Sequence, residues 1–246
     1  MKNYDTIIIG GGPAGISAAL TLRSMRRDAL LISGDYRESG LYRAARVDNY
    51  PGLPEISGRE LLERFYAQAE GVERVRGLAL SAVKVKGGFM VSVGAEVYSG
   101  RTLILAIGAE RVKALPGELE LLGRGVSYCA VCDGALYKGK RVAAVKLRAD
   151  CEEDLEILRR FGCEVTELDA SEVHDLRELD YACVFVLRSS VSASALLPGL
   201  EFLGGVETNI ANVFAAGDCV GKPLQIAKAV GEGQVAAFAA SAAVNG

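Results

Sequence analysis

The spacing of hydrophobic and polar residues along the chain predicts a mixed α/β fold. Residues 6–9 are a short apolar run, residues 16–27 have helical periodicity, and residues 29–33 form a second apolar run. A strand, a helix and a strand in this order make a βαβ unit with parallel strands. Residues 102–107 form another apolar run, which predicts a strand that ends at Gly108.

Two later segments extend this pattern. Residues 79–86 and 89–93 alternate in polarity on either side of a Gly-Gly pair, which predicts a two-residue β-hairpin. Residues 212–216 predict a strand that ends at Gly217-Asp218, and a helix is expected from about 224 to 243. This second strand with a glycine at its tip indicates that the chain returns to its first domain.

The stretch between these segments is poor in glycine. Only Gly162 and Gly199 occur between 141 and 203, although the chain holds 29 glycines. The stretch keeps an α/β rhythm, with strands expected at 141–145, 164–168 and 182–187 and a helix at 150–161. We interpret residues 113–204 as a small, shortened α/β domain. It is inserted into a discontinuous, Rossmann-like domain formed by residues 1–112 and 205–246.

Composition narrows the class of protein. Apolar residues make up 50% of the chain, which argues against disorder. Lys and Arg number 28 against 31 Asp and Glu, and the resulting net charge of −3 argues against a nucleic-acid partner. No apolar run approaches the roughly 20 residues that a membrane-spanning helix needs, and no N-terminal targeting segment is visible. The sequence therefore predicts a soluble, cytoplasmic protein without a membrane partner.

A glycine-rich turn joins the first strand to the first helix. Gly10, Gly12 and Gly15 form G-x-G-x-x-G in the strand–turn–helix setting of a dinucleotide site. The first glycine allows the tight turn, the second lets backbone N–H groups approach a pyrophosphate, and the third lets the helix and strand pack closely. An acidic residue for the ribose is expected about 20 positions later, where Asp35 and Glu38 are the candidates.

Cys129 and Cys132 form a C-x-x-C pair that is followed directly by Asp133. Such a pair closes a small loop and can place one thiol near a helix N-terminus, which lowers its pKa and favours redox chemistry. Zinc would need a second pair or suitably spaced histidines, and the only histidine is His174, so no metal site is expected. Asp133 is a candidate acid or base for a leaving thiolate, the alternative being a helix cap. Three other cysteines are expected to be small buried residues rather than disulfide partners: Cys151, Cys163 and Cys183.

Together these motifs resemble the low-molecular-weight thioredoxin reductase family over nearly the whole chain. The matching segments are GGGPAG at 10–15, VDNYPG at 47–52, LAIG at 105–108, GVSYCAVCDG at 125–134 and VFAAGD at 213–218. The C-x-x-C-D-G element between two halves of an FAD domain is the most specific of them. The resemblance implies FAD on residues 1–112 and 205–246, a thioredoxin-like protein substrate, and a homodimer.

The resemblance also assigns individual residues. The pyrophosphate would lie on the turn formed by Gly10, Gly12, Pro13, Ala14 and Gly15. The adenosine would lie on the loop that contains Ser33, Gly34, Asp35, Glu38 and Gly40. Asp218 would contact the ribitol region, Gly108 would belong to the cofactor site, and the isoalloxazine would lie near Asn49, Gln225 and Ile226. By the same analogy Cys132 faces the flavin, Cys129 attacks the protein disulfide, and Asp133 assists protonation.

The inserted domain departs from the family pattern. Residues 146–151 (KLRADC) stand where the family has a glycine-rich turn for NADPH, and residues 169–172 (DASE) stand where a basic cluster for the 2′-phosphate is expected. The segment from Gly217 to Cys219, with residues 223–226 after it, resembles the pyridine-nucleotide-independent branch more closely. That branch includes ferredoxin-dependent flavin thioredoxin reductases.

These features favour a disulfide reductase that passes electrons from ferredoxin or a similar carrier, through FAD and Cys129/Cys132, to thioredoxin. Three alternatives stay open: a flavin-dependent dithiol oxidase, an NAD(P)H-dependent reductase with an atypical nucleotide site, and a non-catalytic flavoprotein scaffold. An acidic electron carrier would need local positive charge on this negatively charged chain. Arg43 and Arg46 are nominated for it because they lie in the loop that the resemblance places near the flavin, the alternative being an ordinary solvated surface.

Overall fold

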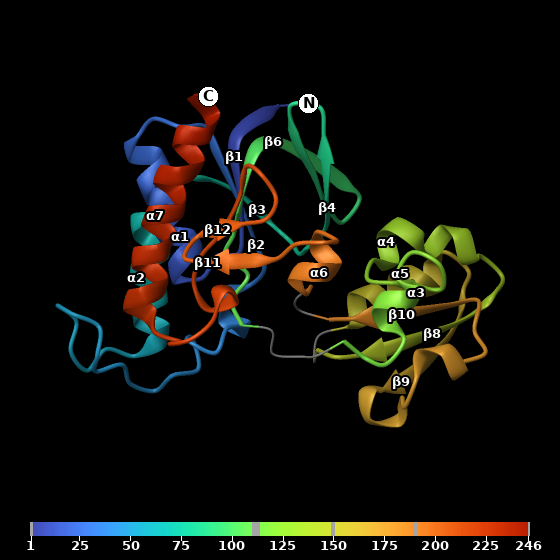
Figure 1. Cartoon of the computed structure of the whole chain (residues 1–246). Coiled ribbons are helices and arrows are strands. Elements are labelled where there is room, and N and C mark those ends of the chain that lie inside the picture. The colour runs from blue at the N-terminus through green and yellow to red at the C-terminus, as the bar shows by residue number, and fades with distance from the viewer. Residues whose placement is uncertain (1, 110–113, 149–150, 189–190, 246) are drawn as a thin grey trace. The chain divides into compact units, whose positions relative to one another are not determined.

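The computed structural model describes residues 2–109, 114–148, 151–188 and 191–245 (Figure 1). The chain divides into two compact units. The first unit comprises residues 1–93, 97–109 and 196–246, and the second comprises residues 94–96 and 110–195.

The first unit is built on a parallel sheet with an antiparallel extension. Its strands are β1 (Asn3–Ile9), β2 (Ala29–Ser33), β3 (Glu73–Arg76), β6 (Glu96–Leu105), β11 (Phe202–Gly204), β12 (Glu207–Thr208) and β13 (Val213–Ala215). The strand order is β11-β12-β13-β6-β1-β2-β3, and the hairpin of β4 (Ala79–Val85) and β5 (Gly88–Val93) joins through β6. β1 lies at the centre, parallel to both β2 and β6, and it is buried because helices or loops cover both faces of such a sheet.

Two long helices lie side by side in this unit, α1 (Pro13–Ser24) and α7 (Ile226–Asn245), as the blue and red ribbons of Figure 1 show. They approach closely because small residues meet: a side chain at Gly233 would stand 2.1 Å from the carbonyl oxygen of Ala14. The shorter helix α2 (Gly58–Gln68) begins at Ser57, whose side chain accepts the N–H of Glu60 as an N-cap.

The second unit contains a four-stranded parallel sheet. Its strands are β7 (Val126–Ser127), β8 (Arg141–Lys146), β9 (Glu164–Asp169) and β10 (Cys183–Leu187), in the order β7-β10-β8-β9. Its α-helices are α3 (Glu118–Leu121), α4 (Ala130–Asp133), α5 (Glu152–Arg160) and α6 (Ala193–Leu196), of which α6 extends by one residue into the first unit. The fold class is therefore α/β in both units, as predicted.

The main differences from the sequence prediction are at boundaries. The helix expected from residue 16 begins three residues earlier, because Pro13 is favourable at a first helical position, and it ends before Arg26, which has a left-handed φ of 57°. The inserted unit ends at Ala195 rather than at 204, because β11 pairs with β12 in the sheet of the first unit. No helix of the described residues is long and apolar enough to cross a membrane.

Candidate functional site

The glycine-rich turn after β1 is tightly packed on one side and open on the other. A side chain at Gly10 would stand 2.2 Å from the carbonyl oxygen of Ala106, and one at Gly15 would stand 1.8 Å from the carbonyl oxygen of Gly10. At Gly12, by contrast, an added Cβ meets no atom within 4 Å. Gly12 is also the N-cap of α1 and provides no side-chain cap, so the first N–H groups of the helix face this space. The turn therefore fits a pyrophosphate.

The loop after β2 provides the expected acidic residue. Asp35 is the first acidic side chain after the strand, and its carboxylate accepts hydrogen bonds from the backbone N–H of Arg37 at 2.9 Å and from Nη2 of Arg76 at 2.8 Å. Ser33 is buried at the strand end, a side chain at Gly34 would meet no atom within 4 Å, and Glu38 is exposed. The loop is compatible with an adenosine, with Asp35 nearer to the strand end than Glu38.

Tyr66 is a residue of this region that the sequence analysis did not single out. Its hydroxyl donates to the carbonyl oxygen of Gly11 at 2.9 Å, and its ring stacks on Tyr36 with the centroids 4.5 Å apart. The guanidinium of Arg74 lies 5.0 Å from the same ring, and burial raises the pKa of the Tyr66 phenol. Tyr66 thus fixes the glycine turn from α2, and no local pattern marks it, because its partner is 55 residues away.

Residues assigned to the flavin ring by the resemblance meet in the structure. Asn49 donates from Nδ2 to Oε1 of Gln225 at 2.7 Å, although the two are 176 residues apart. Ile226 begins α7 and packs on a small apolar cluster that includes Val47 and Ile56.

The loop that carries Asp218 is held by two charged residues of α7. Glu232 accepts the backbone N–H of Gly217 at 2.9 Å, and Lys228 donates to the carbonyl oxygen of Gly221 at 3.0 Å. Lys228 and Glu232 also pair with each other at 3.0 Å. The signal available in the sequence is a Lys–Glu pair four residues apart on an otherwise uncharged helix, which no sequence prediction used.

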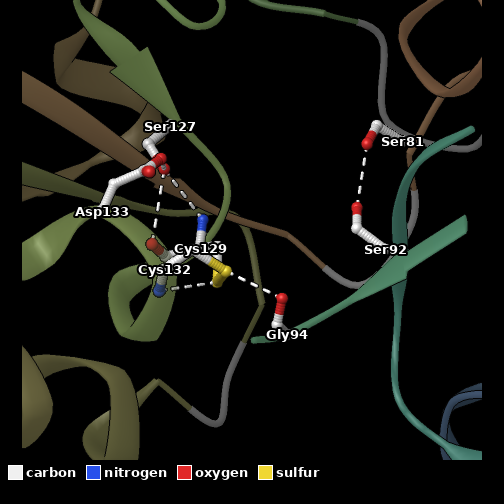
Figure 2. Close-up of a disulfide and its surroundings, with 7 residues drawn as sticks. All are labelled: Ser81, Ser92, Gly94, Ser127, Cys129, Cys132 and Asp133. Atoms are coloured by element: carbon white, nitrogen blue, oxygen red, sulfur yellow. Dashed lines mark hydrogen bonds between the residues drawn. A yellow bond between two sulfur atoms is a disulfide. The ribbon is translucent and has the colours of Figure 1, made fainter. Parts of the chain in front are cut away.

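The two cysteines of the C-x-x-C pair form a disulfide at the start of α4, with their Cα atoms 5.3 Å apart (Figure 2). The backbone N–H of Cys132 donates to Sγ of Cys129 at 3.1 Å. Cys129 is buried and Cys132 is exposed. This N–H is placed to stabilise a thiolate on Cys129 in the reduced form.

Asp133 ends α4 and stands at the N-cap position of the short 3-10 helix that follows, but its side chain makes no capping hydrogen bond. Its Oδ2 instead accepts a hydrogen bond from the Ser127 hydroxyl at 2.7 Å. Two further titratable groups are in its electrostatic surroundings, Tyr137 and Cys183, and burial raises their pKa values to about 12 and about 11.

The other four cysteines are free, as expected for three of them. Cys151, Cys163 and Cys183 are buried in the second unit, and Cys219 is partly buried in the first. Within the described ranges, no group of three or more His, Cys, Asp or Glu side chains could hold a metal ion.

A buried ion pair supports the segment before the disulfide. Glu118 pairs with Arg188, and it also accepts hydrogen bonds from the Tyr128 hydroxyl and the Leu115 backbone N–H, each at 2.7 Å. Both charged side chains are almost fully buried, so removing one partner would leave the other as an uncompensated charge. The pair orients Tyr128, the neighbour of Cys129. No local sequence pattern marks this pair, because Glu118 and Arg188 are 70 residues apart.

The turn after β8, where the family binds a nucleotide, contains charged side chains in place of glycine. Lys146 pairs with Glu167 at 3.0 Å, and Arg148 pairs with Asp154. The first turn of α5 carries three acidic residues, Glu152, Glu153 and Asp154. Residues 149–150 lie outside the described residues. These acidic side chains oppose the helix dipole, which would otherwise favour a phosphate at the start of α5.

Residues 169–172, which replace the family's basic cluster, and the nominated docking residue Arg46 both form hydrogen bonds within the chain. Oδ1 of Asp169 accepts the backbone N–H of Ser171, and the backbone N–H of Asp169 donates to Oε2 of Glu172, which forms a capping box. Arg46 pairs with Asp48 at 2.7 Å and with Glu55 at 2.8 Å. These carboxylates offset the charge of Arg46; both Arg43 and Arg46 are exposed.

Comparisons with known proteins agree with this geometry. Residues 4–148 match the family described as pyridine nucleotide-disulphide oxidoreductase. The thioredoxin reductase of Bacillus subtilis is 40% identical over 168 residues, which are 67% of this chain and 53% of that protein. The chain thus spans about half the length of the curated relatives it matches.

Solved structures match over the whole chain. A ferredoxin-flavin thioredoxin reductase from Clostridium acetobutylicum has a TM-score of 0.85 and 33% identity, covering 100% of this chain and 98% of that one. A thioredoxin reductase from Gloeobacter violaceus has a TM-score of 0.80 and 27% identity, covering 100% and 96%. FAD is the cofactor of the family, and the open glycine turn fits its pyrophosphate. The chain belongs to the pyridine nucleotide-disulphide oxidoreductases and, within them, to the low-molecular-weight thioredoxin reductase family.

Proposed function

We propose that this protein is an FAD-dependent disulfide reductase that delivers electrons through Cys129/Cys132 to thioredoxin or a similar protein. The observation that carries the proposal is the C-x-x-C disulfide with an N–H on one sulfur and a hydrogen-bonded carboxylate behind it. Residues 1–112 and 205–246 would bind FAD, with the pyrophosphate at Gly12. When bound, FAD supplies the two-electron chemistry that reduces the disulfide.

We further propose that the donor is ferredoxin or a similar carrier rather than NADPH. Three carboxylates in the first turn of α5 and the paired state of Lys146 leave the nucleotide-like turn unsuited to a pyrophosphate. The name of the Clostridium acetobutylicum structure points to the same class of donor. Arg43 is the remaining cation of the nominated docking pair.

The dithiol segment also offers an apolar surface to a protein substrate. Val131, between the two cysteines, is 44% exposed, and Leu136, four residues after Cys132, is 69% exposed. Exposed apolar side chains beside a reactive group are typical of protein-docking surfaces. They support a protein disulfide rather than a small molecule as the substrate.

A homodimer is part of the proposal, and the outer face of α7 supports it. Seven residues of α7 are exposed and none is charged: Ala227, Gly231, Gln234, Val235, Phe238, Ala242 and Asn245. A glycine inside a helix costs about 1 kcal/mol relative to alanine. At Gly231 an added Cβ would meet nothing within 4 Å, so packing within the chain does not account for this glycine.

The sequence of this face is complementary to itself. In an antiparallel pair of α7 helices with a two-fold axis between Gln234 and Val235, Phe238 of one copy faces Gly231 of the other. Ala242 likewise faces Ala227. Because the face is uncharged, two copies meet without like-charge repulsion, as a two-fold interface requires. Four free thiols are consistent with a reducing, cytoplasmic location, which we also propose.

The test is anaerobic reduction of the flavin by NADH, NADPH and reduced ferredoxin in parallel, followed by thioredoxin reduction. The proposal expects bleaching by ferredoxin alone and loss of thioredoxin reduction in Cys129→Ser and in Cys132→Ser. Rapid bleaching by stoichiometric NADPH would instead support an NADPH-dependent reductase. Oxygen consumption driven by a dithiol, without ferredoxin-driven turnover, would support the dithiol oxidase.

A further inference from the structure

Ser127 contacts three groups of the dithiol segment through a single hydroxyl (Figure 2). Its Oγ donates to Oδ2 of Asp133 at 2.7 Å and accepts the backbone N–H of Cys129 at 3.0 Å. The carbonyl oxygen of Cys129 lies 3.4 Å from the same Oγ, as a second and weaker acceptor. Ser127 is only 5% exposed, so water has little access to replace these partners.

We propose that Ser127 is a positioning residue that holds Asp133 beside the dithiol in both protonation states of the carboxyl group. A hydroxyl has one hydrogen and two lone pairs. When Asp133 is ionised, the Ser127 hydrogen points to Oδ2. When Asp133 is protonated, its O–H donates to Oγ, and the Ser127 hydrogen turns to the Cys129 carbonyl oxygen. The N–H of Cys129 donates to Oγ in both states. The single hydrogen and two lone pairs of the Ser127 hydroxyl are therefore enough for the hydrogen bonds of either state.

This inference rests on the proposed function, because disulfide reduction makes Asp133 change its protonation state. The Cys129 thiolate attacks the substrate disulfide, whose S–S bond breaks, and the departing thiolate takes the proton of Asp133. Asp133 then removes the proton of the Cys132 thiol. The Cys132 thiolate attacks Sγ of Cys129 to form the enzyme disulfide, and Asp133 protonates the second departing thiolate. Two substrate thiols, an oxidised enzyme and an ionised Asp133 remain.

The structure corresponds to the last state of this reaction, in which the enzyme is oxidised. Cys129 and Cys132 form a disulfide, and the shorter of the two possible Ser127 donations is the one to Asp133. Tyr137 and Cys183 are two titratable groups in the electrostatic surroundings of Asp133. Burial raises their pKa values to about 12 and about 11, so both stay neutral between pH 5 and 9.

The test compares Ser127→Thr with Ser127→Val, which have the same shape and differ in the hydroxyl. The flavin-loaded protein is reduced with dithiothreitol, freed of excess reductant without oxygen, and mixed with one of two small disulfides. Hydroxyethyl disulfide releases a basic thiolate that needs a proton, whereas 5,5′-dithiobis(2-nitrobenzoate) releases a weakly basic one that does not. Alkylation and mass spectrometry then count the thiols that remain at each time between pH 5 and 9.

We expect Ser127→Val to slow the reaction with hydroxyethyl disulfide about tenfold relative to Ser127→Thr, and to leave the other disulfide within about twofold. In an Asp133→Asn background the Ser127 substitutions should have no further effect. Ser192→Ala, which changes another buried serine of this unit, is the control for packing.

Equal slowing with both disulfides, or the same slowing in the Asp133→Asn background, would show that Ser127 is only structural and would overturn the inference. No difference between Ser127→Thr and Ser127→Val would overturn it as well. A different result would contradict the proposed function: the wild-type protein exchanges with small disulfides but does not turn over a protein disulfide with any electron donor.

Discussion

Asn49 and Gln225 hydrogen-bond to each other at 2.7 Å and so join the loop after the first βαβ unit to the segment just before α7. The two side chains come from opposite ends of the sequence, and both were assigned to the flavin ring by family resemblance. Their contact orders the two loops before a cofactor arrives.

We therefore expect Asn49→Ala and Gln225→Ala each to weaken FAD binding by about three- to tenfold, the effect of one hydrogen bond. The double variant should be no weaker than the worse of the two single variants, because the residues act as a pair. Titration of the apoprotein with FAD, followed by flavin fluorescence, measures the dissociation constants. Additive effects of the two substitutions would show that the pair is not the functional unit.

A second prediction concerns the glycine turn. Gly12→Val should abolish FAD binding and change the free energy of unfolding by no more than about 1 kcal/mol, because an added side chain there meets open space. Gly15→Ala should instead destabilise the fold, since its Cβ would stand 1.8 Å from a carbonyl oxygen. Denaturant unfolding and FAD titration of both variants separate the two effects. A stable Gly12→Val protein that is still yellow would refute the assignment.

How well the sequence predicts a feature of this structure depends on how far apart in the chain the contacting residues are. The strands at 29–33 and 141–145 and the turn at Gly10 depend on local periodicity and local spacing, and the structure contains them. Tyr66 and the Glu118–Arg188 pair act on partners 55 and 70 residues away, so no local pattern reveals them. The end of the inserted unit was misplaced for the same reason.

The candidate site likewise contains residues that a local motif marks and one residue, Ser127, whose role depends on the folded structure. The C-x-x-C-D-G motif pointed to Cys129, Cys132 and Asp133; the two cysteines form a disulfide, and the Asp133 carboxylate is hydrogen-bonded to Ser127. Ser127 stood inside the quoted motif without a role, because nothing in spacing alone says that its hydroxyl reaches Asp133 rather than solvent. Hydrogen bonds that form only in the folded chain, such as Ser127 to Asp133, leave no mark in residue spacing.

A third prediction tests the surface beside the dithiol. Leu136→Asp should raise the KM for thioredoxin about tenfold and leave the reaction with a small disulfide unchanged, because an exposed apolar contact is lost without change to the sulfurs. Leu119→Asp, at a leucine of the same unit that is 46% exposed, is the matched control. Steady-state kinetics with both disulfides distinguish the outcomes, and equal effects of the two substitutions would argue against a docking surface at Leu136.

The buried thiols give a fourth prediction, on pH. Burial raises the pKa of Cys183 from 9.0 to about 11 in the folded protein. Between these values the unfolded chain loses the thiol proton while the folded protein keeps it, so the free energy of unfolding falls as the pH rises. At lower pH the contribution is fully present. Iodoacetamide at pH 8 should therefore label Cys129 and Cys132 of the reduced protein well before Cys183.

The measurement is chemical unfolding from pH 8 to 10.5 for the wild type and Cys183→Ala. We expect a smaller loss of stability across this range in the variant, by about 1–2 kcal/mol, whatever its stability at pH 8. Tyr137 titrates higher, near pH 12, and is present in both proteins, so it does not account for the difference. Parallel pH profiles would contradict the role of Cys183.

The last prediction places the two-fold interface on α7. Phe238, which is 54% exposed, faces Gly231 of a second copy in the proposed antiparallel arrangement. Phe238→Glu should convert the dimer into a monomer. Because the interface is two-fold symmetric, the substitution introduces two like charges and removes two apolar contacts at once. Gly231→Leu should do the same by filling the space that the phenyl ring needs. Sedimentation equilibrium should give twice 26.0 kDa for the wild type and 26.0 kDa for both variants.

Leu203→Glu is the matched control, since Leu203 is an apolar residue of the same unit that is 63% exposed but lies outside α7. It should stay dimeric. Because Gly231 and Phe238 meet across the axis, combining Gly231→Phe with Phe238→Gly exchanges the two residues and keeps the surfaces complementary. The double variant should therefore be a dimer, whereas Gly231→Phe alone and Phe238→Gly alone should weaken the dimer. A monomeric wild type would disprove the dimer, and a dimer that persists in Phe238→Glu would move the interface away from α7.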